Sequence, residues 1–495
     1  MARRQRVTMR GSLAVGVAAI AVLAMSTVEP ALAQTTSTTV FSNDASSSST
    51  TTPTTTSGTF TPTTSTVPPT SSTTSSTTRS TTSSTTAAAA GSPDFTASSS
   101  VPATVAVGQS FHAVAPVRVV DSRALPYRVG VLSTWSGGQT QGVAVTGGVS
   151  GVPGSASSVV LNVTVTGGST GGFLTLWPQG AARPTASSLN FLAGQTISNQ
   201  VTVKVGEGGV NAGMVSVFNY LGSTDVVVDV NGFYDGSVGD GFVSQAPVRI
   251  VDSRALPYRV GLLSTWSGGQ TQVVAATGGV SGVPVDADAV VLNVTATGGS
   301  AANFLKIWPT GLAQPNVSSL NFAAGETIAN AVTVKVGSGI NAGKISIFNF
   351  AGVQNVIVDV AGYFKAGTGK AFFPLAPVRI VDSRPAPYRV GALGSWGPGV
   401  TQGVNATGVV SGVPVDADSV VANLTATGGT APSFLTMWPT GQSVPNASSL
   451  NFLAGQTIPN AVTVKLGSAP YVGVISVLNY AGTTNAIIDI AGYYG

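Results

Sequence analysis

The sequence predicts an all-β protein of three tandem antiparallel β-sandwich domains, with about eight strands each, after a disordered Ser/Thr-rich N-terminal region. Two observations lead to this prediction. A 13-residue phrase at residues 117–129 recurs at 248–260 and at 378–390. Each copy is followed by short runs of β-branched residues separated by Gly and Pro, without a helical period of useful length. A closed barrel is the alternative arrangement for such strands.

The strands can be placed in the first copy from alternation and turn residues. Turn clusters such as Gly167-Gly168-Ser169 separate the apolar runs. We expect strands near residues 117–123, 140–146, 158–166, 172–177, 187–191, 197–205, 213–220 and 224–231.

Both ends of each copy are marked by aromatic residues. Each copy begins with a Phe that stands five residues before the Pro directly preceding the phrase; these are Phe111, Phe242 and Phe372. Each copy closes with Gly and two aromatic residues. A repeat of this length is a whole domain, and short Gly-rich linkers suggest separate domains in a row. The expected segments are a signal peptide at 1–33, a disordered linker at 34–110, and β-sandwich repeats at 111–235, 242–365 and 372–495.

The first 33 residues have the pattern of an export signal. Four arginines precede an apolar core at 12–23, and Ala31-Leu32-Ala33 forms a small-x-small cleavage site. Cleavage there removes those arginines and Glu29, which leaves 18 basic and 17 acidic residues. The mature chain is then nearly neutral, so we expect a secreted or cell-surface protein with no nucleic-acid partner and no stable membrane span.

Residues 34–110 consist largely of Ser and Thr with scattered Pro. Such a segment buries too little apolar surface to offset the conformational entropy of folding, so we expect a disordered spacer. Its many hydroxyl groups are also compatible with a glycosylated stalk.

Three motifs recur in each copy: an Arg-x-x-Asp-Ser-Arg opening, a Ser-Leu-Asn-Phe-x-Ala-Gly-x-Thr-Ile middle and an Asp-x-x-Gly-aromatic-aromatic end. Over residues 111–495 this combination resembles a β-rich repeat domain common in exported proteins of actinobacteria. The resemblance implies a secreted or cell-surface accessory module. It implies no catalytic residues, because that family has no established activity.

The residue types argue against catalysis. The chain has no Cys and a single His, His112, so we expect no disulfide, no His/Cys metal site and no cofactor. Two acids per copy could form a glycosidase pair, but Asp121 lies two residues from Arg123, and a nearby cation lowers the pKa of a carboxyl group. We therefore expect no enzyme. The recurring acids are Asp121, Asp252 and Asp382, and Asp229, Asp359 and Asp489.

The repeated phrase is predicted to be a structural ion-pair clasp that holds the first strand to its loop. On a regular strand Asp121 and Arg123 point to the same face, and Arg118 points to the other. The alternative is an arginine-lined site for carboxylated or phosphorylated glycans. The clasp residues are Arg118, Asp121, Arg123, Arg249, Asp252, Arg254, Arg379, Asp382 and Arg384.

Tryptophan recurs at two positions in each copy and supplies the candidate ligand-binding residues. In the second copy Lys306 and Trp308 share one strand face, and Lys rarely points into a core, so Trp308 should lie on the less buried face unless the strand twists at its end. We expect each Trp to be covered by a loop or a neighbouring domain; the alternative is an exposed Trp that stacks on a sugar ring. The candidates are Trp177, Trp308, Trp438, Trp135, Trp266 and Trp396, which Tyr127, Tyr258 and Tyr388 could join.

The sequence therefore predicts a secreted, non-catalytic cell-surface protein with a structural or adhesive role. The alternative hypothesis is a multivalent carbohydrate-binding protein for cell-wall or extracellular polysaccharide, because three weak sites on one chain gain avidity. Exposure of the recurring tryptophans separates the two hypotheses, since buried rings cannot stack on a sugar.

Overall fold

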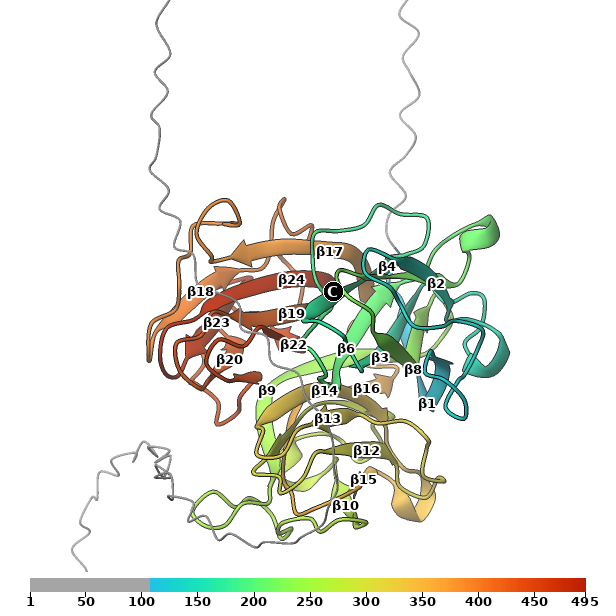
Figure 1. Ribbon diagram of the computed structural model, residues 1–495. Coiled ribbons are helices and arrows are strands. Elements are labelled where there is room, and N and C mark those ends of the chain that lie inside the picture. Colours follow the sequence, from blue (N-terminus) through green and yellow to red (C-terminus); the bar gives the residue numbers. More distant parts are fainter. Residues whose placement is uncertain (1–106) are drawn as a thin grey trace, which may run out of the picture. The chain divides into compact units, whose positions relative to one another are not determined.

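The computed structural model describes residues 107–495, which form one unit of 24 strands and four short 3₁₀ turns (Figure 1). The expected signal peptide and nearly all of the expected linker lie outside the described residues. The strands fall into three sets of eight, which we call repeats 1, 2 and 3. The prediction of three all-β sandwiches is thus confirmed.

The strands of each repeat follow the same order along the chain. Repeat 1 contains β1 (Ser110–Asp121), β2 (Thr140–Ala144), β3 (Ser158–Thr166), β4 (Gly172–Pro178), β5 (Leu189–Phe191), β6 (Ile197–Lys204), β7 (Met214–Asn219) and β8 (Asp225–Asp235). Repeat 2 contains β9 (Asp240–Asp252), β10 (Thr271–Ala275), β11 (Ala289–Thr297), β12 (Asn303–Pro309), β13 (Leu320–Phe322), β14 (Ile328–Lys335), β15 (Lys344–Asn349) and β16 (Asn355–Ala366).

Repeat 3 contains β17 (Phe372–Asp382), β18 (Thr401–Asn405), β19 (Ser419–Thr427), β20 (Ser433–Pro439), β21 (Leu450–Phe452), β22 (Ile458–Lys465), β23 (Val474–Asn479) and β24 (Asn485–Tyr494). The 3₁₀ turns are η1 (Gly148–Ser150), η2 (Gly209–Asn211), η3 (Gly279–Ser281) and η4 (Gly339–Asn341). In Figure 1 the three repeats run from blue to green, from green to yellow and from orange to red.

Each repeat is a sandwich of two antiparallel layers of four strands, and the inner layers of repeats 1 and 2 join through β1 and β9 into one eight-stranded sheet. In repeat 1 the inner sheet has the order β1-β8-β3-β6 and the outer sheet has the order β2-β7-β4-β5. Val159 and Leu161 of β3 pack in the core shared with the outer sheet, but Val160 and Asn162 on the opposite face are also buried. A sandwich strand usually has one solvated face, so something else must cover the second face of the inner sheet.

The neighbouring repeat provides that cover through buried asparagines. The side-chain amides of Asn162, Asn293 and Asn423 donate to backbone carbonyls of Ser318, Ser448 and Ser187, at 2.7, 2.6 and 2.8 Å. These bonds run from repeat 1 to 2, from 2 to 3 and from 3 back to 1. The three repeats therefore close into a ring.

A second set of asparagines strengthens the same closure. Asn330 is fully buried; its Nδ2 donates to Oδ1 of Asn162 at 2.9 Å, and its Oδ1 accepts from the backbone N–H of Gln200 at 3.0 Å. Asn460 and Asn199 make the equivalent contacts with the repeat before them in the ring. We call Asn162, Asn199, Asn293, Asn330, Asn423 and Asn460 the asparagine ring.

Six aromatic side chains form an apolar plug where the repeats meet, with one pair from each repeat. Contacts between repeats have ring centroids 4.0 Å apart for Phe111 and Phe364, and 4.3 Å for Tyr234 and Phe372. The hydroxyl groups of Tyr234 and Tyr494 lie 2.6 Å apart, so these phenols satisfy each other. The aromatic plug consists of Phe111, Tyr234, Phe242, Phe364, Phe372 and Tyr494.

The expectation of separate domains on short linkers is therefore wrong in one respect. The linkers are short, but the first strands of successive repeats also pair directly, with Phe111 opposite Asp240 and Gln109 opposite Phe372. The aromatic marks at the two ends of each repeat, which the sequence analysis used only as boundaries, meet in the plug. The repeated unit is one third of a closed assembly.

The junction between repeats 1 and 2 contains a pair of acids. Burial and then repulsion from the carboxylate of Asp288 raise the pKa of Asp240 to about 6, while His112 and Lys335 oppose the shift. Ser157 stands at the position of Asp288 in repeat 1, where it donates to Gln109 at 2.6 Å. Only this junction of the described ring therefore combines two carboxyl groups.

Replacing Gly232 by Ala is expected to destabilise the ring by about 1–3 kcal/mol, because the new Cβ would overlap the ring of Phe111 in the plug. Gly236 is the matched control, since a Cβ there meets no atom within 4 Å. Chemical unfolding followed by circular dichroism measures both variants. Equal stability of the two variants would contradict the packing described for the plug.

Asp240→Asn is expected to change the pH dependence of stability. The folded-state pKa lies above the ordinary value of 3.8, so the folded protein binds more protons between about pH 4 and 6 and loses stability as the pH rises through that range. The variant should match the wild type near pH 4 and exceed it by up to about 1 kcal/mol at pH 7.5, since the group is half-buried. A stability difference that does not vary with pH would refute this assignment.

Candidate functional site

The predicted clasp residues lie together at the end of β1. Oδ2 of Asp121 accepts from Nη1 of Arg118 at 3.1 Å and from Nη2 of Arg123 at 2.6 Å. Nε of Arg123 donates to Oδ1 of the same carboxylate at 2.9 Å. Asp121 is fully buried, and its equivalents Asp252 and Asp382 have the same partners in repeats 2 and 3.

Arg118 departs from its predicted direction. The expectation that it points away from Asp121 is wrong, because the pairing of β1 with β8 is irregular between Arg118 and Val120. An irregularity of one residue reverses the alternation of faces, so Arg118 and Asp121 meet although they are three residues apart. The same shift occurs in β9 and β17, where it brings Arg249 to Asp252 and Arg379 to Asp382.

Arg118 also joins the clasp to the middle of the inner sheet. Its Nε and Nη2 donate to the two carboxylate oxygens of Asp229 on β8, at 2.8 and 3.3 Å. Burial raises the pKa of Asp229 to about 6, and the hydrogen bonds and charge of Arg118 oppose that shift. Burial also raises the pKa of Asp359 and Asp489, which have the same bidentate partners.

The clasp acids are buried and bonded to arginine. Asp121 and Asp229 have no exposed surface, so no substrate can reach them. The pKa of Asp121 is lowered: its hydrogen bonds and charge interaction with Arg123 outweigh burial, which acts in the opposite direction. In the described part of the chain, no group of three or more His, Cys, Asp or Glu side chains could hold a metal ion.

The six tryptophans are all buried. Trp135, Trp266 and Trp396 have no exposed surface and lie in the core between the sheets. The indole N–H groups of Trp135 and Trp396 donate to the carbonyls of Val217 and Val477, both at 3.0 Å. These tryptophans therefore help to hold the outer sheet in place from the core side.

Trp308 is covered, although strand parity places it on the less buried face of β12. Lys306 is only half-buried, as its strand parity predicts, but Trp308 is 6% exposed. The chain turns back after β12 and covers the ring, and the indole N–H donates to the carbonyl of Leu312 at 3.1 Å. Trp177 and Trp438 are 6% and 4% exposed and make the same bond to the residue four positions later.

Among the aromatic residues that the sequence singled out, a tyrosine in the loop after the clasp remains accessible. Tyr127 and Tyr388 are each 59% exposed, and Tyr258 is half-buried. The guanidinium of the clasp arginine stacks on each ring, with Arg123 4.4 Å from the centre of Tyr127. We call residues 122–128, 253–259 and 383–389 the Tyr/Arg loops.

The last residue of each Tyr/Arg loop is an exposed arginine. Nε of Arg128 donates to the carbonyl of Arg123 at 3.2 Å, and Arg259 and Arg389 make the same bond in their repeats. None of these three arginines forms an ion pair with a described acid. The clasp thus uses two of the three arginines of the phrase and leaves the third available.

A stacked aromatic pair is exposed on the outer sheet of every repeat. Ring centroids are 4.6 Å apart for Phe173 and Tyr220, with equivalent pairs in the other repeats. Tyr220 and Phe350 are 48% and 55% exposed. The sequence analysis missed these pairs, although the signal was present: an aromatic residue directly follows the Asn that ends β7, β15 and β23.

The Tyr/Arg loop and the aromatic pair lie at the same end of each sandwich. β1 runs from the aromatic plug to the clasp, and Tyr220 precedes the turn into β8, whose first residue Asp225 accepts from Ser122 at 2.8 Å. We call this the distal end. Each of the three repeats has a distal end of this kind.

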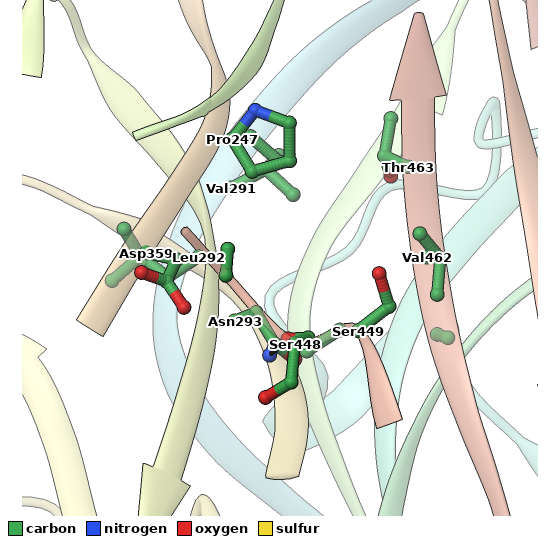
Figure 2. Close-up of a pocket in the computed structure, with 13 residues that line it drawn as sticks. Pro247, Val291, Leu292, Asn293, Asp359, Ser448, Ser449, Val462 and Thr463 are labelled. Carbon is green, nitrogen blue, oxygen red and sulfur yellow. Dashed lines mark hydrogen bonds between the residues drawn. The ribbon is translucent and has the colours of Figure 1, made fainter. Parts of the chain in front are cut away.

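The recorded cavities are too small for a sugar or cofactor. Two of them, of about 30 and 40 Å³, lie where repeats meet. Figure 2 shows the first, where Asn293 lies beside Ser448 near Asp359. Typical ligand pockets are about ten times larger, and this volume suits one water molecule. Among residues 107–495, no helix has the length and apolar character needed to cross a membrane.

Comparisons with known proteins identify no family. Neither protein-family models nor curated proteins match the chain. One similar solved structure is described as the triple jelly roll fold and turret assembly in an archaeal virus, with 10% identity, 79% of this chain and 90% of the other covered, and a TM-score of 0.15. Another is the atomic structure of Sulfolobus turreted icosahedral virus, with 11% identity, 78% and 90% covered, and a TM-score of 0.14. Scores this low carry no argument about this chain.

Arg118→Ala is expected to cost about 3–5 kcal/mol of stability, because Asp121 and Asp229 lose a partner while remaining fully buried. Arg123→Ala should cost less, since Arg118 still contacts Asp121. Arg128→Ala is the control and should stay within about 0.5 kcal/mol, as its side chain is exposed. Chemical unfolding of the three variants ranks them, and an equal cost for Arg118 and Arg128 would contradict the structural role of the clasp.

Proposed function

We propose that the chain is an exported, non-catalytic cell-surface protein whose three-repeat head has an adhesive or structural role. The observation that carries this proposal is the division of the recurring residues into two classes. The recurring acids and tryptophans are buried, whereas at the distal ends the last arginine of each Tyr/Arg loop is exposed and the recurring tyrosines and aromatic pairs are exposed or half-buried.

The buried class supports a passive role. A general acid or nucleophile must reach its substrate, but the recurring carboxylates are covered and bonded to arginine. Binding sites for small molecules are usually concave and large, whereas the two cavities where the repeats meet hold about 30 and 40 Å³.

The exposed class supports adhesion. Side chains such as Tyr127 and Tyr220 cost solubility when they are exposed, and nothing in the fold requires them on the surface. Their occurrence in all three repeats gives a rigid, trivalent display. The export signal at residues 1–33 and the resemblance to a repeat domain of exported actinobacterial proteins favour a location outside the cell.

The carbohydrate-binding alternative now depends on the exposed tyrosines and no longer on the tryptophans. Its original candidates, the six tryptophans, cannot stack on a sugar because their rings are buried. The exposed tyrosines of the distal ends favour this alternative, because an exposed aromatic ring can stack on a sugar. The same surface would serve an adhesive protein of the envelope.

Fractionation of the source cells tests the proposal. The full chain should be found in the envelope or the medium, should be cleaved by protease added to intact cells, and should release no new reducing ends from purified envelope polysaccharide. A chain protected inside intact cells would contradict the location, and release of reducing ends would contradict the passive role.

A further inference from the structure

We propose that the Tyr/Arg loops are three corresponding sites for an anionic polysaccharide. In each site the last arginine of the loop (Arg128, Arg259 or Arg389) would pair with a carboxylate or phosphate, and the tyrosine would stack on a sugar ring. This inference rests on the proposed function, because it names the ligand class of the adhesive surface.

The balance of charge at the Tyr/Arg loops favours an anionic ligand. In repeats 2 and 3 three arginines of the phrase meet two buried acids, so one positive charge is not compensated. In repeat 1 Asp225 stands where the other repeats have Asn355 and Asn485, and it supplies a third acid. Repeats 2 and 3 should therefore attract an anion more strongly than repeat 1.

Hydrogen bonds hold the arginines of each loop in a fixed orientation. Arg128 is held by bonds from Nε to the carbonyl of Arg123 and from Nη2 to the carbonyl of Ser122, which leaves Nη1 for a ligand. Arg123 bonds to Asp121 through Nε and Nη2, so its Nη1 is also available. Two fixed guanidinium groups bonded to one short segment favour an anion with several oxygen atoms.

The tyrosine of each loop is held by the stacked clasp arginine. Arg123 is anchored by the buried Asp121 and covers one side of the Tyr127 ring, while more than half of the tyrosine stays exposed. A ring that is already oriented loses little conformational entropy on binding. An aromatic face beside cations suits a sugar ring with an acidic substituent, since both parts of the ligand find a partner.

Charge distribution distinguishes a polysaccharide from a nucleic acid. The sites of repeats 2 and 3 each carry one uncompensated arginine, without the basic tract that follows a phosphate backbone, and the mature chain is nearly neutral. Three corresponding sites on one chain suit a long polymer that can occupy them together, so that weak sites give firm attachment.

Binding of the full chain to defined polymers tests the inference. Polygalacturonate probes carboxylates and phosphomannan probes phosphates, so the two arms distinguish the sources of anionic groups. Dextran is the neutral control, polyglutamate lacks sugar rings, and single-stranded DNA tests the nucleic-acid alternative. We expect at least one acidic polysaccharide to bind, more weakly as salt rises, and to exceed the three control polymers at least tenfold.

Variants locate the site on the ring. Arg128→Ala, Arg259→Ala and Arg389→Ala combined should weaken binding at least 30-fold, and Arg128→Ala alone should weaken it less than either other single variant. The matched control combines Lys204→Ala, Lys335→Ala and Lys465→Ala, which removes the same charge from strand ends near the aromatic plug. That control should stay within about twofold of the wild type.

Three results would overturn the inference: no binding of either acidic polysaccharide, equal losses in the arginine and lysine variants, or equally tight binding of DNA or polyglutamate. If any of these occurs while the chain is still found on the cell surface, the ligand class is wrong and the proposed function stands. If the chain is also found inside intact cells, both fail.

Discussion

Hydrogen bonds between buried asparagines of successive repeats are the interaction on which the rest of the structure depends. A buried amide without partners costs about 1–3 kcal/mol, so the six residues of the asparagine ring fix how the repeats meet. The aromatic plug adds apolar burial around the same junctions. The inner sheet can then be buried on both faces, which explains why Val159 and Val160 are both covered although their side chains point in opposite directions.

Much of the fold could be predicted because its signals are local. Alternation and Gly/Pro turns locate eight strands per repeat, and the strands observed in repeat 1 closely match those expected, apart from an earlier start of β1 and a later end of β8. The pairing of Asp121 with Arg123 follows from strand parity. The closure of the ring could not be derived, because nothing local says that Asn162 bonds to a residue 156 positions later. The one available signal was the run of apolar residues without alternation in the inner strands, which is typical of sheets covered on both faces.

The errors at the candidate site also have particular causes. Strand parity predicted the wrong face for Arg118, because a one-residue irregularity in β1 reverses the alternation of faces. It also suggested a less buried Trp308, whose ring is covered by the turn that follows the strand. Both events depend on how a segment packs. The corrected site is simpler than the predicted one. Packing uses the tryptophans, the acids and two arginines of each phrase, while Tyr127 and Arg128 and their equivalents remain exposed.

Because every repeat buries part of itself against two others, the ring should unfold as one cooperative unit. Differential scanning calorimetry of the full chain measures this most directly. With about 0.7 kcal/mol per residue, the described residues should give a single transition of about 270 kcal/mol, with equal calorimetric and van't Hoff enthalpies. Three separable transitions, or a van't Hoff enthalpy near one third of the calorimetric value, would show independent domains and contradict the closed ring.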